Sequence, residues 1–219
     1  KSGGGIYSTS NNISIYGGGV TNNSVTKTGN AGGIYVSDSG TLTVGGNVNI
    51  SGNWKGDSKE SGSKNNVYLD YYEDDFATIV IEKELTGENS SIGVTTATPV
   101  ATTKDASVKI AAGKGTHAIT DADKGHFTPD TGYCEVQKKD DGALYLTHVH
   151  AYGAVSYTWA IDNTTCKAEH KCTACQHVED ETVNTQKQVT QNCSCTLDEL
   201  STFTATFTNP AFAQQTKEK

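Results

Sequence analysis

The chain has 219 residues, of which 34% are hydrophobic, 8% aromatic and 19% charged, and its formal net charge is −8. This low charge content, with abundant Gly, Ser, Thr and Asn, favours a fold of strands and turns over disorder. No apolar run approaches the roughly 20 residues of a membrane-spanning helix, and the absence of arginine among the 17 basic residues argues against nucleic acid as a partner.

A short apolar motif recurs along the first third of the chain. Gly3-Gly4-Gly5-Ile6-Tyr7 returns 28 positions later as Gly32-Gly33-Ile34-Tyr35, and Asn66-Val67-Tyr68-Leu69 follows after 33 more positions. Since the sequence opens within this repeat and contains no methionine, we expect it to be a fragment of a longer protein.

A second pattern lies between these copies. Residues 13–23 (ISIYGGGVTNN) match residues 42–53 (LTVGGNVNISGN): apolar residues alternate with polar ones, and Gly/Asn clusters follow. Alternation predicts strands with one buried face, and Gly/Asn clusters supply the corners between them. Short strands repeated every 20 to 35 residues can bury that face only by stacking on one another.

The repeats therefore predict a right-handed parallel β-helix over residues 1–147. At about 25 residues per coil this range gives about six coils, with Ile, Val, Leu and Tyr stacked inside. Further strands are expected at residues 78–81, 91–95, 106–110 and 142–146. Charged, glycine-bearing loops are expected at 54–64 and 83–89, and no helical period is visible.

The composition changes after Thr147. Five of the six cysteines and four of the six histidines fall between residues 148 and 195. We expect a second, small cysteine-containing β module at 148–219, with strands near 154–159, 182–183 and 202–208. A core of about 70 residues is marginal alone, so a crosslink or a metal would stabilise it.

The cysteines of this module carry the strongest chemical signal. Cys172-x2-Cys175 followed by Cys193-x-Cys195 resembles the two knuckles of a structural zinc site, although the second knuckle is one residue short. Disulfides are the open alternative, and the spacing does not decide between them. Cys166, His170 and His177 are further potential ligands nearby.

The Gly-Gly-Ile-Tyr repeats, the segment TLTVGGNVNISGN and the sequence YTWAIDNTTCKAEHKCTACQHVEDETV together resemble large adhesin-like surface proteins of gram-positive, mostly gut-dwelling (Firmicutes-type) bacteria. The resemblance covers nearly the whole chain. In that family cysteines stand about where Cys166, Cys172 and Cys193 do, whereas Cys175 and Cys195 look like additions.

This resemblance implies an extracellular module of the bacterial cell wall or surface and no reaction. We expect a non-enzymatic structural module whose polar β-helix face binds glycans, host proteins or other cell-surface proteins weakly and multivalently. Trp54, in an expected loop, is the better candidate for stacking on a sugar ring, and Trp159 is expected in a core.

Three alternatives involve chemistry elsewhere. The acidic run from Asp70 to Asp75 is the basis for a carbohydrate-active enzyme, a polysaccharide lyase or glycoside hydrolase, although a solvated loop is the simpler interpretation. His148 and His150 alternate along an expected strand and form a potential metal pair that lacks a third ligand. Cys134 is expected to be a core thiol rather than a nucleophile.

Overall fold

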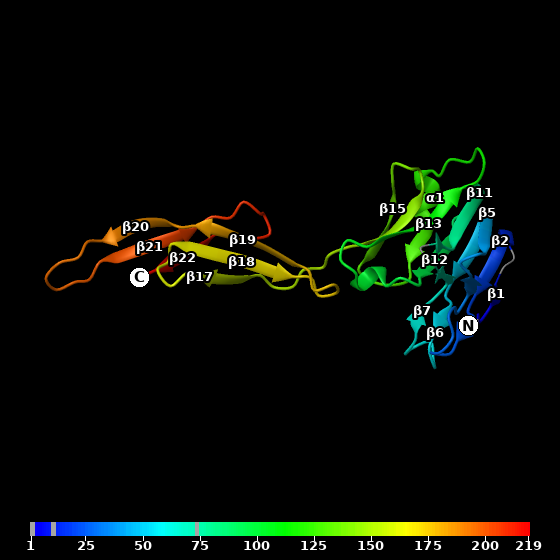
Figure 1. Cartoon of the computed structure of the whole chain (residues 1–219), viewed down its shortest axis with the longest axis horizontal. Coiled ribbons are helices and arrows are strands. Elements are labelled where there is room, and N and C mark those ends of the chain that lie inside the picture. Colours follow the sequence, from blue (N-terminus) through cyan, green and yellow to red (C-terminus); the bar gives the residue numbers. More distant parts are fainter. Residues whose placement is uncertain (1–2, 10–11, 73–74) are drawn as a thin grey trace. The chain divides into compact units, whose positions relative to one another are not determined.

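The computed structural model describes residues 3–9, 12–72 and 75–219, and about 51% of the chain is strand. It divides into two compact units, Lys1–Val149 and His150–Lys219, which are shown in Figure 1. The predicted boundary followed residue 147. Each unit is described by itself below.

The first unit is a parallel β-solenoid of about four turns. Its strands are β1 (Ile6–Ser8), β2 (Ile13–Thr21), β3 (Ser24–Val25), β4 (Ile34–Val36), β5 (Thr41–Ser51), β6 (Trp54–Lys55), β7 (Ser63–Lys64), β8 (Val67–Leu69), β9 (Tyr71–Tyr72), β10 (Asp75–Phe76), β11 (Thr78–Leu85), β12 (Ser91–Thr96), β13 (Ser107–Gly113), β14 (Phe127–Pro129), β15 (Cys134–Lys138) and β16 (Leu144–His148).

The strand register follows the repeats seen in the sequence. Ile6 pairs with Ile34, Ile34 with Val67, and Val67 with Val94, so successive coils are 28, 33 and 27 residues long. The second repeated pattern also aligns, because Ile13 pairs in parallel with Leu42. The predicted parallel β-helix is confirmed.

The expected number of six coils is wrong. β13 pairs in parallel with β11, and β14 pairs in parallel with β12, but the next two strands run the other way: β16 pairs antiparallel with β13, and β15 pairs antiparallel with β16. Residues 134–148 therefore form a hairpin against the solenoid and add no coil. The coils are also longer than the 25 residues assumed.

Apolar side chains fill the interior in ladders that run from coil to coil. Leu42 pairs with Ile79, which pairs with Ala111, and all three are fully buried. Burial of each such Ile or Leu side chain contributes about 1.5–3 kcal/mol. Since no single coil can enclose its own strands, stability depends on this stacking.

A tyrosine ladder accompanies the first repeated motif. The Tyr35 ring stacks between Tyr7 and Tyr68, with centroid distances of 4.9 and 5.9 Å. Tyr35 is fully buried, and its hydroxyl donates a hydrogen bond to the carboxylate of Asp70, which is also buried.

Close approach of neighbouring coils explains the glycines of the repeated motif. A Cβ on Gly32 would lie 2.3 Å from the Trp54 carbonyl oxygen, and one on Gly33 would lie 2.3 Å from that of Asn66. Both contacts are with backbone of the next coil, which cannot withdraw without opening the stack.

Two expected loops are shorter than predicted. At residues 54–64, Trp54 pairs in parallel with Ser24 and antiparallel with Lys64, so both ends of the segment are strand. At 83–89, β11 continues to the buried Leu85, which pairs with Gly46 beyond a register shift. Pairing across coils overrides the polar composition at these positions.

Two short helices were not foreseen. One is a 3-10 turn, η1 (Val100–Thr102), and the other is α1 (Asp121–Gly125), which begins at a capping box formed by Thr120 and Asp123. Both are too short to produce a helical period in the sequence. Asp123 is fully buried and accepts hydrogen bonds from the N–H groups of Leu85 and Thr120.

The second unit consists of two three-stranded antiparallel sheets. Their strands are β17 (Ser156–Trp159), β18 (Thr165–Lys171) and β19 (Val178–Asn184) in one sheet and β20 (Gln186–Gln191), β21 (Leu200–Ala205) and β22 (Gln215–Glu218) in the other. Cys166, Ala205 and Phe212 are buried, and the main-chain N–H of Ala213 donates to the Tyr157 hydroxyl. The predicted β-rich module is confirmed.

Candidate functional site

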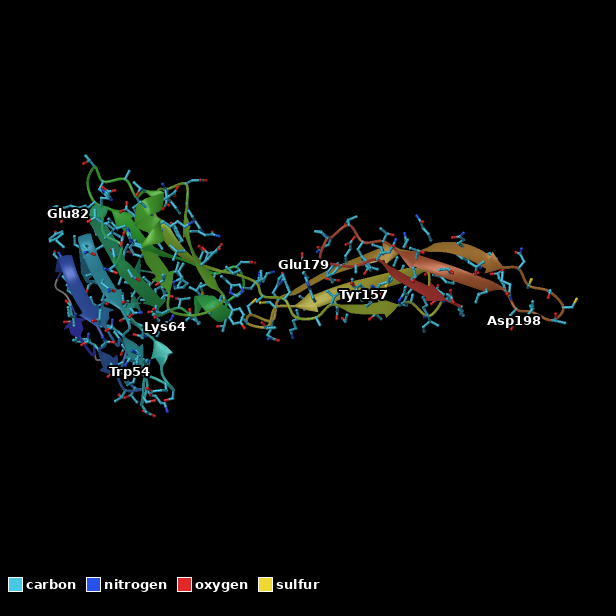
Figure 2. All side chains as sticks on the ribbon, turned by 180° about the vertical axis from the view of Figure 1, so that it is seen from behind. Trp54, Lys64, Glu82, Tyr157, Glu179 and Asp198 are labelled. Carbon is cyan, nitrogen blue, oxygen red and sulfur yellow. The ribbon has the colours of Figure 1, made fainter. Side chains whose placement is uncertain are left out.

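The solenoid carries a pocket of about 570 Å³ on its surface. Trp54 and Lys64 lie beside each other on the paired strands β6 and β7 and line it (Figure 2). The other lining residues are Ser51, Gly52, Asn53, Lys59, Gly62, Ser63, Asn66, Ser91, Thr128, Pro129 and Asp130. The pocket thus combines one large aromatic ring with hydroxyls, amides and two ammonium groups.

Trp54 is held in place by both its neighbours in the coil stack. Its main-chain N–H donates to the carbonyl of Asn23 at 3.1 Å, and it pairs with Ser24 on one side and Lys64 on the other. A Cβ on Gly62 would lie 3.1 Å from the edge of the indole, so the absence of a side chain there leaves room for the ring. The ring itself is half-buried.

A ladder of asparagines forms the floor behind this ring. Asn23 donates from its side chain to Asn53 Oδ1 at 3.1 Å, and Asn53 donates to Asn66 Oδ1 at 3.1 Å. Asn66 continues the ladder by donating from its side chain to Asp130 at 2.5 Å. These side chains replace main-chain pairing at the corners, where buried polar groups need partners.

Asp130 ends the ladder in a polar but enclosed position. Burial raises the pKa of its carboxyl above the usual range, although hydrogen bonds from Asn66 and Thr95 act in the opposite direction. Asn66 donates from its main chain to one oxygen and from its side chain to the other, and Thr95 donates a third bond. Both oxygens of the Asp130 carboxylate are therefore occupied by hydrogen bonds that connect neighbouring coils.

In the acidic run from Asp70 to Asp75, the described side chains form no enclosed group of carboxylates of the kind that catalysis needs. Asp70 is buried against the tyrosine ladder through its bond from Tyr35. Tyr71 is exposed, on β9, which pairs with β10. Glu73 and Asp74 lie outside the described residues.

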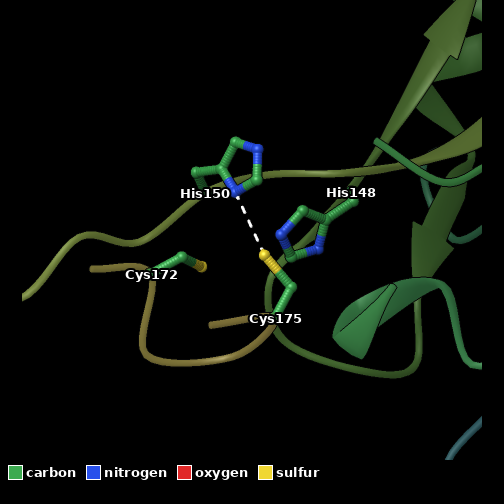
Figure 3. Close-up of side chains that lie close together, drawn as sticks. All are labelled: His148, His150, Cys172 and Cys175. Atoms are coloured by element: carbon green, nitrogen blue, oxygen red, sulfur yellow. Dashed lines mark hydrogen bonds between the residues drawn. The ribbon is translucent and has the colours of Figure 1, made fainter. Parts of the chain in front are cut away.

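A cluster of three metal-ligand side chains lies within the second unit. Its members are His150, Cys172 and Cys175. One ligand atom from each lies within 4.8 Å of the others, and Cys175 Sγ is 3.3 Å from His150 Nδ1 (Figure 3). Cys172 is fully buried, and His150 and Cys175 are half-buried.

The turn that carries both cysteines is tightly bonded. The N–H of Cys172 donates to the His177 carbonyl at 2.8 Å, and the N–H of Gln176 donates to the Cys172 carbonyl at 3.0 Å. Gln176 has a φ of 63°, a left-handed conformation that closes the turn directly after Cys175.

His150 is fixed beside this turn by main-chain pairing. The N–H of Gly153 donates to the Lys171 carbonyl at 2.9 Å, and that of Thr173 donates to the Ala151 carbonyl at 2.9 Å. The segment after His150 therefore runs along the end of β18, and this brings the imidazole to the two sulfurs.

The environment of Cys172 favours its thiolate. Burial alone would raise the pKa of this thiol, but hydrogen bonds from the Cys175 N–H, the His150 side chain and the N–H groups of Ala174 and Ala151 act together in the opposite direction. Their combined effect outweighs burial, and the pKa falls to about 5. A thiolate at neutral pH is the form that binds metals.

The four predicted zinc ligands are only partly brought together. Cys172 and Cys175 are in the cluster, whereas Cys193 and Cys195 are exposed, between β20 and β21, and are not members of it. None of the six cysteines forms a disulfide in the structure. Cys166 lies in β18 opposite Trp159, where burial raises its pKa.

Cys134 lies in β15 and packs against the solenoid core. Burial raises the pKa of its thiol, so it is not activated as a nucleophile. The two histidines nearest in sequence have other partners: His117 contacts Asp123 at 3.2 Å, and His126 Nδ1 lies 2.9 Å from the Ser90 carbonyl oxygen.

Sequence reasoning treated the histidine pair and the cysteine pair as separate features. A histidine upstream of a Cys-x2-Cys pair is a signal for one metal site, and in the second unit it applies to His150. What concealed it was the expectation that both histidines lie on a strand, since β16 ends at His148 and His150 lies in the loop beyond.

Comparison of the chain with protein-family models, curated proteins and solved structures finds no match. Among the described residues, no helix is both long and apolar enough to cross a membrane.

Proposed function

We propose that this chain is a non-enzymatic module of a bacterial cell-surface, adhesin-like protein, and that its solenoid binds glycans weakly at the Trp54 pocket. The observation that carries this proposal is the open pocket of about 570 Å³ with an indole ring on its wall. Pockets of this size accommodate small ligands such as a short oligosaccharide.

The chemistry of the pocket suits a sugar. The apolar C–H face of a pyranose ring packs on an aromatic ring, and its hydroxyls need donors and acceptors around the rim. Trp54 offers the ring, Ser51 and Ser63 offer hydroxyls, and the ammonium groups of Lys59 and Lys64 donate hydrogen bonds.

Binding is favoured over cleavage by the supply of carboxylates. Glycoside hydrolysis generally uses a pair of them, one as acid and one as base or nucleophile. Asp130 is the only acidic residue among the described residues that line the pocket, and both its oxygens accept hydrogen bonds from the ladder. The enzyme alternative therefore rests on the acidic run from Asp70 to Asp75 alone.

A single pocket of this kind binds a glycan weakly, and a high overall affinity requires many copies of the pocket. On a cell surface, many copies engaging the same glycan or host surface raise the overall affinity without a tight individual site. The net charge of −8 and the absence of arginine disfavour nucleic acid as the partner.

The test is a glycan array probed with the full chain, clustered on a multivalent support, followed by titration of the best ligand. Trp54→Ala is expected to weaken binding about tenfold, the effect of losing about 1.4 kcal/mol. The matched control is Tyr16→Ala, because Tyr16 is an exposed aromatic residue that does not line the pocket.

Three outcomes would contradict the proposal in different ways. Unchanged binding by the Trp54 variant would move the site elsewhere, and no binding to any glycan would leave a spacer. Release of shortened polysaccharide that is abolished by the double substitution Asp74→Ala and Asp75→Ala would support the enzyme alternative.

A further inference from the structure

Two thiols and one imidazole of the second unit lie close together (Figure 3). The ligand atoms of Cys172, Cys175 and His150 are all within 4.8 Å of one another. In a tetrahedral zinc site the donor atoms are about 3.3 to 3.8 Å apart, given bond lengths near 2.0–2.3 Å. The 3.3 Å between Cys175 Sγ and His150 Nδ1 is already within this range, and the 4.8 Å limit leaves the other two separations at most about 1.5 Å to close.

The main chain of the second unit holds the imidazole beside the two sulfurs. Tyr152 forms an antiparallel bridge with Cys172, and the N–H of Thr173 donates to the Ala151 carbonyl at 2.9 Å. The ring of His150 also stacks on that of Tyr152, with centroids 5.4 Å apart. The three ligands are therefore positioned before any ion binds, which lowers the entropic cost of binding one.

The turn between the cysteines is arranged to hold a metal-bound thiolate. Main-chain N–H groups of Cys175 and Ala174 donate to the sulfur of Cys172 from within the Cys-x2-Cys turn. Such N–H···S bonds stabilise negative charge on a ligand sulfur, as outer-shell groups of metal sites do.

We propose that His150, Cys172 and Cys175 bind a single Zn²⁺ ion, with a nitrogen or oxygen donor at the fourth corner of the tetrahedron. The site lies within the second unit and is independent of the glycan binding proposed for the solenoid. Its role is to tie the segment after His150 to the Cys-x2-Cys turn, in a unit of about 70 residues whose core is marginal alone.

The donor set selects zinc among the common metals. Two thiolates with an imidazole are typical of zinc, whereas iron–sulfur clusters generally use four cysteines, and magnesium and calcium require oxygen ligands. Two thiolates also neutralise the 2+ charge of the ion, which reduces the cost of placing it beside the buried Cys172.

The proposal replaces half of the ligand set expected from sequence. Cys193 and Cys195 are exposed and lie outside the cluster, whereas His150 belongs to it. The two sets make different predictions, because four cysteines give four sulfur ligands and the proposed set gives two.

The test uses the full chain, purified under reductant and loaded with Zn²⁺. Native mass spectrometry is expected to show one zinc per chain, and X-ray absorption at the zinc edge is expected to show two sulfur ligands and two lighter ones. Cys175→Ser should lower the zinc affinity more than about 100-fold, because loss of even an outer-shell group typically costs about 10–100-fold. The double variant Cys193→Ser and Cys195→Ser is the matched control and should keep wild-type affinity.

A conservative variant guards against loss of folding. His150→Cys should retain one zinc and raise the number of sulfur ligands from two to three. The proposal is overturned if the reduced wild-type chain binds no zinc, or if its absorption spectrum shows four sulfurs. It is equally overturned if the His150→Cys spectrum still shows two sulfurs, or if the Cys193/Cys195 variant loses the ion.

Discussion

The asparagine ladder behind the pocket provides a sensitive test of how the coils are held together. Asn53 is 1% exposed. It donates from Nδ2 to the Val20 carbonyl at 2.7 Å and accepts at Oδ1 from the Asn23 main-chain N–H at 2.9 Å. Asn53→Ala removes both bonds and leaves a main-chain donor and a main-chain acceptor without these partners.

The expected cost follows from these two groups. A buried polar group that loses its hydrogen-bond partner costs about 1–3 kcal/mol, so the pair should destabilise the solenoid by about 3 kcal/mol. For a unit of about 150 residues, this corresponds to a fall in melting temperature of about 6–12 °C. The matched control is Asn89→Ala, because Asn89 is exposed and its substitution should change stability by less than about 0.5 kcal/mol.

The assay exploits the placement of the two tryptophans, one in each unit. In a Trp159→Phe background the emission of Trp54 reports on the solenoid alone. Thermal and urea unfolding of Asn53→Ala and Asn89→Ala are compared with that background. If the Asn53 variant melts within about 2 °C of the Asn89 variant, the ladder does not stabilise the stack as argued.

Three further substitutions test other parts of the solenoid by the same unfolding assay. Tyr35→Phe removes the hydroxyl that donates to a buried carboxylate and should cost about 1.5–3 kcal/mol, whereas Tyr7→Phe at the exposed end of the ladder should be nearly neutral. Burial opposes ionisation of Asp123, but main-chain and hydroxyl donors outweigh it and hold the pKa of this carboxyl below its usual range. Its stabilising contribution is therefore present above the unfolded pKa of about 3.9 and is lost as the pH falls through the lower folded value. The deficit of Asp123→Ala should be about 2–4 kcal/mol at pH 7 and should shrink below about pH 4; a deficit that is constant with pH would contradict this account. Gly33→Ala places a methyl group 2.3 Å from a carbonyl oxygen of the next coil and should destabilise the solenoid by about 2 kcal/mol or more. Its control is Gly132→Ala, because the space around Gly132 is open. If the two variants are equally stable, the steric argument is refuted.

The fold was largely predictable because the sequence motifs of the solenoid recur from coil to coil. The alignment of residues 13–23 with 42–53, made on sequence alone, corresponds to the observed pairing of Ile13 with Leu42. The closing hairpin was not predictable in the same way. The strand at Leu144–His148 has ordinary alternation, and alternation does not reveal whether a strand will pair parallel or antiparallel.

The candidate sites were predictable only in part, because they depend on contacts between distant segments. Trp54 was identified from the sequence as a sugar-stacking candidate in an expected loop, but its pocket is built with Asp130 and Thr128, which are more than seventy positions away. Likewise, the spacing of Cys172 and Cys175 identified a knuckle, whereas the partner ligand, His150, depended on main-chain pairing between residues 151–153 and 171–173.

The reversal after β13 also affects self-association. In a parallel solenoid each coil is a template for the next, so an uncovered last coil invites a second molecule to add its own strands and polymerise. Here the outer edge of β13 is occupied by β16, which runs in the opposite direction. A second copy therefore meets no free parallel template at the outer edge of β13.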